Sequence, residues 1–134
     1  MKKIIFCLLM IFSLTVGANE YDYKITKVID GDTVEIEVDF LPVELGNRLP
    51  VRIYGIDSPE IFGKCIDEVT KAKEARKYMM SLIGSDYKII IKGRDKYFRI
   101  VGDIVTPKGV VSDLMIEGGH AVTYDARKKQ SWCN

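Results

Sequence analysis

The stretch that decides the fold is DGDTVEIEVD, residues 30–39. Gly31-Asp32 is a dipeptide typical of tight turns, and from Thr33 to Asp39 apolar and acidic side chains alternate without interruption. Alternation with a period of two predicts a strand that buries one face. The preceding residues, 21–30, also have the composition of a strand. We therefore predict a hairpin that turns at Gly31-Asp32.

The rest of the chain adds three strands and two helices. Strands are predicted at 51–56, 87–92 and 97–105, and 41–49 is predicted as a loop or a continuing ribbon. Within residues 65–83, apolar side chains recur every three or four positions. This spacing predicts an amphipathic helix, with Gly84 as its C-terminal cap. Its apolar face is predicted to comprise Ile66, Val69, Ala72, Ala75, Met79 and Leu82, and its polar face Glu68, Lys71, Lys73, Glu74 and Lys77. A short helix is predicted from Ser112, as N-cap, to Ile116.

These elements predict a mainly β protein with helices, of the α+β class. Five short strands with one long inserted helix suit a closed five-stranded barrel of the OB type, with one long and one short helix. An open α+β sheet is the alternative, and the strand pattern alone does not decide between them.

The first 18 residues predict export. Lys2 and Lys3 precede an apolar run from Ile4 to Val16, and Val16 and Ala18 form a small-x-small cleavage site, so residues 1–18 are predicted to be a signal peptide. A membrane anchor would need about 20 apolar residues. Residues 19–134 then form one predicted domain of 116 residues, periplasmic or secreted, with 18 basic and 19 acidic residues. Nucleic-acid binding would therefore need a local cluster of positive charge.

Cys65 and Cys133 are the cysteines that remain after cleavage. An even number of cysteines in an exported protein is consistent with a disulfide, and we expect this pair to be bridged. Two unpaired thiols are the alternative. Such a bridge would pin the C-terminal residues to the start of the long helix.

Five charged side chains at predicted strand ends form a candidate site. Asp32 and Asp57 are carboxylates suited to a hard cation such as Ca²⁺ or Mg²⁺. Glu60 follows Pro59 on a stiffened segment and could take a proton from attacking water. Arg52 and Arg99 each interrupt an apolar strand and could bind phosphate through their planar forks. Each residue alone is better explained as a turn or surface residue, so only their joint occurrence is informative.

The chain has a single histidine, His120, which argues against catalytic sites that depend on histidine. One histidine is too few for a zinc site with several histidine ligands. His120 alone also gives little support to a serine–histidine triad. We expect His120 to be a packing or surface residue.

With these motifs the chain resembles the thermonuclease family, the staphylococcal-nuclease-like domains, from Tyr23 to Tyr124. The family's Asp-Gly-Asp-Thr is found at 30–33, its Arg-x₄-Asp-[Thr/Ser]-Pro-Glu at 52–60, and its Asp-Lys-Tyr-x-Arg at 95–99. The resemblance implies an OB-fold barrel and a Ca²⁺-dependent endonuclease that acts on DNA and RNA. Cleavage of the P–O5′ bond would leave 3′-phosphate ends.

The resemblance also implies a role for each matched residue. Asp32, Asp57 and the backbone carbonyl of Ser58 would ligate Ca²⁺. Glu60 would be the general base, and Arg52 and Arg99 would stabilise the phosphoryl group. The residues that would contact substrate are Lys96, Tyr97 and, by a looser match, Tyr124.

One departure from the family pattern lies in the third motif, where Phe98 replaces a glycine. A bulky side chain there could change how Arg99 is aimed, or could pack in the core. The alternative function is a catalytically weak or inactive OB-fold module that binds nucleic acid, for which Tyr54, Tyr97 and Phe98 could serve as stacking surfaces. We expect a monomer with no stable membrane association after signal cleavage.

Overall fold

The computed structural model describes residues 19–134, and the predicted signal peptide lies outside the described residues. The strands are β1 (Glu20–Tyr21), β2 (Lys24–Asp30), β3 (Thr33–Glu37), β4 (Arg48–Ile53), β5 (Ile56–Asp57), β6 (Lys88–Arg94), β7 (Ile100–Thr106), β8 (Gly109–Val110) and β9 (Val122–Thr123). The helices are η1 (Val43–Leu45, a 3₁₀ turn), α1 (Ile66–Leu82) and α2 (Val111–Glu117). Within the described part of the chain, no helix is long and apolar enough to cross a membrane.

The predicted hairpin is present. β2 and β3 pair antiparallel, and Asp30 faces Thr33 across the turn. Val34, Ile36 and Val38 are all buried, because the alternating pattern turns every second side chain toward the core. β3 continues into an antiparallel pair with β4, so the turn and both neighbouring strands form one continuous layer.

The main sheet has the order β1-β6-β7-β4-β3-β2. β4 pairs parallel with β7, and β6 pairs antiparallel with β7, which joins the two halves of the chain. The mixed α+β class is therefore as predicted.

Closure of the barrel differs from the prediction. Among residues 19–134, no ladder joins β2 to β6. Glu20 and Tyr21 already occupy that edge of β6, opposite Ile90 and Ile89. The backbone N–H of Ile25 donates instead to the Tyr87 hydroxyl, at 2.8 Å. The gap between β2 and β6 is thus bridged by a side chain and not by strand pairing.

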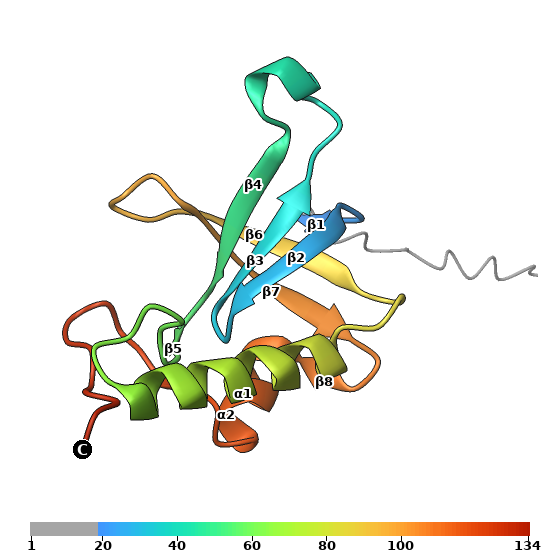
Figure 1. Ribbon diagram of the computed structural model, residues 1–134. Coiled ribbons are helices and arrows are strands. Elements are labelled where there is room, and N and C mark those ends of the chain that lie inside the picture. The colour runs from blue at the N-terminus through green and yellow to red at the C-terminus, as the bar shows by residue number, and fades with distance from the viewer. Residues whose placement is uncertain (1–18) are drawn as a thin grey trace, which may run out of the picture.

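Both helices lie at one end of the sheet (Figure 1). Helix α1 buries Ala72, Ala75 and Met79 against it, and α2 adds Val111 and Met115. All five side chains are fully buried, so this end of the sheet is sealed by small and flexible apolar groups. The η1 turn lies at the far tip of the β3–β4 hairpin, away from the helices.

Several local predictions are wrong. Ile66 is exposed and Glu68 is buried, so the first turn of α1 does not follow the predicted faces. The helix ends at Leu82, with Ile83 as its cap. Helix α2 begins at Val111, because Ser112 donates its hydroxyl to Asp103 on β7. These differences come from tertiary partners that local periodicity does not reveal.

Two further predictions concern the third motif and the aromatic residues. The last long strand begins at Ile100 and not at Tyr97, because Phe98 N–H donates to the Asp95 carbonyl and closes a turn. Tyr54 and Phe98 are exposed, so neither packs in the core. His120 stacks on Tyr78, with ring centroids 4.6 Å apart.

Candidate functional site

The two predicted metal-ligand aspartates converge beneath the β2–β3 turn. Asp32 lies in that turn and Asp57 ends β5, and both are almost completely buried. The backbone N–H of Ser58 donates to Asp32 Oδ2 at 3.0 Å, which ties the two segments together. Gly31 is needed here, because a Cβ at this position would lie 2.9 Å from the Ser58 side chain. The turn glycine thus permits the close approach of the two acidic loops.

Arg52 lies between these carboxylates. Its Nη1 donates to the carbonyls of Ile53 (3.0 Å) and Ile56 (2.9 Å), which fixes the guanidinium inside the loop that follows β4. Its Nη2 lies 3.7 Å from both Asp32 Oδ2 and Asp57 Oδ1. One buried guanidinium therefore faces both acids at once.

The oxygen atoms present fit a hard divalent cation. Among the described residues, three buried side-chain atoms have no hydrogen-bond partner: Arg52 Nη2, Asp57 Oδ1 and Ser58 Oγ. A buried carboxylate oxygen without a hydrogen bond is costly, and here Asp57 Oδ1 lies beside a second carboxylate that faces the same guanidinium. Ca²⁺ and Mg²⁺ prefer carboxylate and carbonyl oxygens. Asp32, Asp57 and Ser58 together supply this kind of donor set.

A third buried carboxyl, Asp30, supports the turn. Its Oδ1 accepts the backbone N–H of Asp32 at 3.0 Å. Burial, together with the nearby charge of Asp32, raises the pKa of Asp30 to about 7. The acidic turn therefore concentrates negative charge that a cation would relieve.

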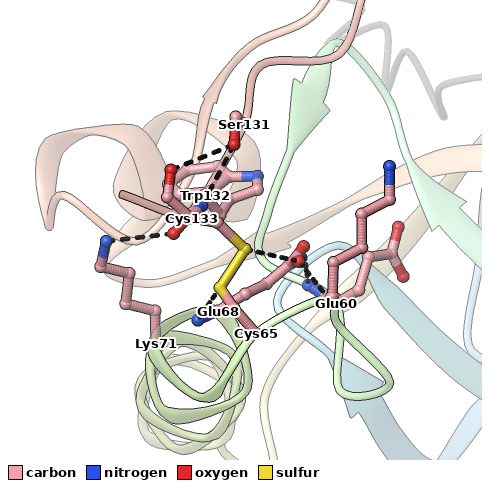
Figure 2. The surroundings of a disulfide bond; sticks show 8 residues. Glu60, Cys65, Glu68, Lys71, Ser131, Trp132 and Cys133 are labelled. Carbon is pink, nitrogen blue, oxygen red and sulfur yellow. Dashed lines mark hydrogen bonds between the residues drawn. A yellow bond between two sulfur atoms is a disulfide. The ribbon is translucent and has the colours of Figure 1, made fainter.

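Glu60 is exposed at the rim of this cluster. Its backbone N–H donates to buried Glu68 Oε1 at 3.3 Å, and Glu68 Oε2 accepts from Lys64 N–H at 2.8 Å (Figure 2). Glu68 thus holds the loop that carries Glu60. The Glu60 carboxylate itself pairs with Lys129 Nζ at 2.7 Å.

The C-terminal segment completes this side of the site. Lys129 Nζ also lies 3.2 Å from Asp57 Oδ1, and Trp132 Nε1 donates to Asp57 Oδ2 at 3.3 Å. Burial lowers the pKa of Lys129, but the bonds to Glu60 and Asp57 outweigh it and leave the pKa raised. Cys65 and Cys133 form a disulfide, with Cα atoms 6.0 Å apart, that anchors the segment (Figure 2).

The residues matched to substrate binding line a cleft of about 570 Å³ on the other side of Arg52. Its charged and aromatic lining consists of Arg52, Tyr54, Lys92, Arg94, Asp95, Lys96, Tyr97, Arg99, Tyr124 and Asp125. Tyr124 is positioned by its N–H bond to the Gly55 carbonyl, at 2.8 Å. Its ring lies 5.3 Å from the Arg52 guanidinium. Positive charge alternates with aromatic rings, a combination typical of single-stranded nucleic-acid sites.

Arg99 is held within the β6–β7 hairpin. Its Nε donates to Asp95 Oδ2 at 2.7 Å, and its guanidinium lies 5.3 Å from the Tyr97 ring. Burial raises the pKa of Asp95, but hydrogen bonds from Arg99 and Tyr97 outweigh it, and the pKa is lowered. Phe98 has a φ of 65°, the left-handed region, and lies under the Arg94 guanidinium at 4.1 Å. Phe98 thus adopts the left-handed backbone conformation that glycine adopts most easily.

The predicted residues therefore form two groups joined by Arg52. Arg52, Lys96, Tyr97, Arg99 and Tyr124 line the cleft. Asp57, Ser58 and Glu60 line a second cavity of about 350 Å³, against the C-terminal segment. The salt bridge from Arg52 to Asp57 connects the two.

Four further residues of the site were missed by sequence reasoning: Asp30, Glu68, Lys129 and Trp132. Asp30 is part of the first motif and could have been included. The helical periodicity places Glu68 on the exposed face of the helix. Lys129 belongs to the run Arg127-Lys128-Lys129, and such a run usually indicates a solvent-exposed segment. The disulfide, the bond from Lys71 to Trp132 and the pairing of β9 with β5 bring Lys129 and Trp132 to the acids.

The fold and this site define a nuclease-type domain, and comparison with known proteins agrees. Residues 50–132 match the family model described as staphylococcal nuclease homologue. The chain belongs to the staphylococcal nuclease family.

Named relatives are nucleases too. The chain is 28% identical over 129 residues to a protein of Escherichia coli described as an uncharacterized endonuclease, covering 93% of this chain and 75% of that one. It is 32% identical over 87 residues to staphylococcal-like nuclease CAN1 of Arabidopsis thaliana, covering 62% of this chain and 25% of the relative. It is also 25% identical over 115 residues to endonuclease YhcR of Bacillus subtilis, covering 78% and 9%.

Proposed function

We propose that this protein is a Ca²⁺-dependent endonuclease that hydrolyses phosphodiester bonds of DNA and RNA and leaves 3′-phosphate ends. The observation that carries the proposal is the contact of one buried guanidinium, Arg52, with both Asp32 and Asp57 at the end of a cationic cleft. Family membership and relatives named as endonucleases support nuclease activity in general.

Each residue of the site has a role in the proposed reaction. Asp32, Asp57 and Ser58 would hold the divalent cation, which would neutralise negative charge on the phosphate. Arg52 stabilises the charge that builds on the phosphoryl oxygens as the P–O5′ bond breaks, and Arg99 does so from the hairpin. Glu60 takes a proton from the attacking water, the water oxygen bonds to phosphorus as the P–O5′ bond breaks, and the leaving O5′ takes up a proton from solvent.

The cleft supplies substrate binding. Lys96 contributes positive charge to its rim, and its ammonium lies 5.1 Å from the Tyr97 ring. Tyr97 is 68% exposed, so its face is available to a base or sugar. Tyr124 packs beside Arg52, where it borders the phosphate position. Stacking on such rings tolerates any base, which fits a substrate range that includes both DNA and RNA.

A catalytically weak module that binds nucleic acid is the second candidate function. Arg99 favours it, because the Nε–H of its guanidinium is already bonded to Asp95 at 2.7 Å, which leaves only its Nη groups for a phosphate. The same cleft would then bind single strands without cutting them.

A gel assay with single-stranded and duplex DNA, and with RNA, separates the two functions. The nuclease proposal expects degradation in Ca²⁺ and none in excess chelator. Glu60→Gln and Arg99→Ala should each lower the rate by about a hundredfold or more. Lys24→Gln, on β2, serves as a matched control for lost surface charge. Retarded but intact nucleic acid in Ca²⁺ would favour the binding module.

We also propose that the protein acts after export, to the periplasm or outside the cell, as a monomer without stable membrane association. The signal-peptide pattern of residues 1–18 supports export. A disulfide between Cys65 and Cys133 fits an oxidising compartment. Fractionation of cells, followed by determination of the N-terminal residue of the exported protein, tests cleavage after Ala18.

A further inference from the structure

The C-terminal segment, residues 125–134, follows β9 and folds back over the acidic side of the site. It contains neither helix nor strand. It is fastened to α1 by the disulfide from Cys133 to the N-cap residue Cys65 and by a bond from Lys71 Nζ to the Trp132 carbonyl, at 3.3 Å (Figure 2). The last residues of the chain are therefore held beside Asp57 by side chains alone.

Lys129 is the residue of this segment that contacts both acids. Its ammonium lies 2.7 Å from Glu60 Oε1 and 3.2 Å from Asp57 Oδ1. Asp57 Oδ1 is buried and has no hydrogen-bond partner within the described residues, so this ammonium and the Arg52 guanidinium are the cations beside it. The Lys129 side chain is 49% exposed, whereas that of Asp57 is 3% exposed. A half-exposed cation thus neutralises a buried carboxylate.

The neighbouring basic residues do not share this position. Arg127 pairs with Asp125 inside the segment itself, at 3.5 Å, and Lys128 is exposed. Contact with the acidic site is therefore specific to Lys129 and is not a general effect of three basic residues in a row. Lys128 provides a matched control of the same charge.

We propose that Lys129 is a tethered cation that occupies Asp57 and Glu60 in the metal-free protein and competes with the divalent cation for Asp57. This inference rests on the proposed function, because it takes Asp57 as a metal ligand. A cation coordinated at about 2.3–2.6 Å from Asp57 would be repelled by an ammonium on the same carboxylate. Lysine suits this role, since its charge sits on a flexible stem and can withdraw without moving the backbone.

The disulfide makes the competition intramolecular. A tail bound at Cys133 keeps the ammonium near the acids at an effective concentration set by the few residues between Lys129 and Cys133. Reduction lengthens the tether to the whole segment after β9, so Lys129 should leave more often. Metal affinity would then depend on the redox state of the protein without any change in the ligands.

Trp132 provides a direct signal of the exchange. It is the only tryptophan in the chain, and its indole N–H donates to Asp57 Oδ2. A cation bound to Asp57 places new charge on the carboxylate that accepts this indole N–H. Indole emission therefore reports binding in the absence of substrate and turnover.

The test is calorimetric titration of Ca²⁺ into metal-free wild type, Lys129→Gln and Lys128→Gln, with indole emission followed in parallel. Lys129→Gln should bind Ca²⁺ roughly two- to fivefold more tightly, the range expected for loss of a half-exposed ion pair. Lys128→Gln should match wild type. Reduction should tighten binding by wild type and leave Lys129→Gln unchanged.

The measured Ca²⁺ affinities distinguish three outcomes. Equal or weaker Ca²⁺ binding by Lys129→Gln overturns the competition and leaves the proposed function intact. Equal affinity of the oxidised and reduced wild type overturns the role of the tether. If no form binds Ca²⁺, both this inference and the Ca²⁺ dependence of the proposed nuclease are wrong.

Discussion

Replacing Arg52 with methionine removes the cation that faces Asp32 and Asp57 while keeping a side chain of similar length. The three side chains are only 10%, 7% and 3% exposed, so solvent cannot compensate for the lost charge. Removing one partner of a buried ion pair costs about 3–5 kcal/mol, because it leaves a buried charge uncompensated. The carbonyls of Ile53 and Ile56 also lose their donor, at about 1 kcal/mol each.

The expected loss of about 5–7 kcal/mol in the free energy of unfolding approaches the whole stability of a marginal domain. Urea denaturation at low temperature, with chelator present, measures it. Ca²⁺ at about 100 times its dissociation constant should restore roughly 2.7 kcal/mol, because the cation takes over the neutralising role. Activity should stay absent even when the fold is restored.

Two controls separate charge from packing. Arg52→Lys keeps the charge and should lose less stability than Arg52→Met. The double variant Arg52→Met/Asp57→Asn should be more stable than Arg52→Met alone, since one uncompensated carboxylate is gone. If Arg52→Met unfolds within 1 kcal/mol of wild type in chelator, the guanidinium is not what stabilises the acids, and the reasoning fails.

Three further predictions use the same urea assay or nuclear magnetic resonance. Replacing both Cys65 and Cys133 with alanine should lower the free energy of unfolding by about 2–4 kcal/mol, since the bond closes a loop with a sequence separation of 68 residues; a loss below 0.5 kcal/mol would show that the cross-link does not constrain the unfolded chain. Phe98→Gly should be about 1 kcal/mol more stable than Phe98→Ala, because both lose the ring but only glycine adopts φ 65° without steric cost; equal stabilities would count against strain at this position. The lowered pKa of Asp95 means that its pair with Arg99 stabilises the fold above the ordinary aspartate range and is lost as the pH falls through the lowered value; a carboxyl titration should show this pKa rise in Arg99→Ala, which keeps the backbone N–H bond to Asp95, and an unchanged pKa would rule out the Arg99 side chain as a cause.

How far the sequence predicts the structure depends on whether a signal is local. The alternation at 33–38 predicts β3 and its buried face correctly, because strand periodicity follows directly from side-chain geometry. Glu68 is mispredicted, because its burial depends on backbone N–H groups of the loop before the helix. The open edge between β2 and β6 likewise depends on β1, two residues whose pairing partner is distant in sequence.

The candidate site divides in the same way. Asp32, Arg52 and Asp57 lie in short motifs, and the structure brings them into contact. Lys129 has no motif, since a basic run at the end of a chain is usually solvated. Its position depends on a covalent bond between residues far apart in sequence, which spacing alone cannot indicate.

The parallel ladder between β4 and β7 has a consequence for how the protein is made. It pairs Arg52 with Val101, two residues after Arg99, so Arg52 and Arg99 line the same cleft only when segments from opposite halves of the chain have joined. Contacts between residues so distant in sequence form late in folding. An incomplete or partly folded chain therefore carries the separate motifs but no assembled phosphate site, and the potential to cut nucleic acid arises only with the finished fold.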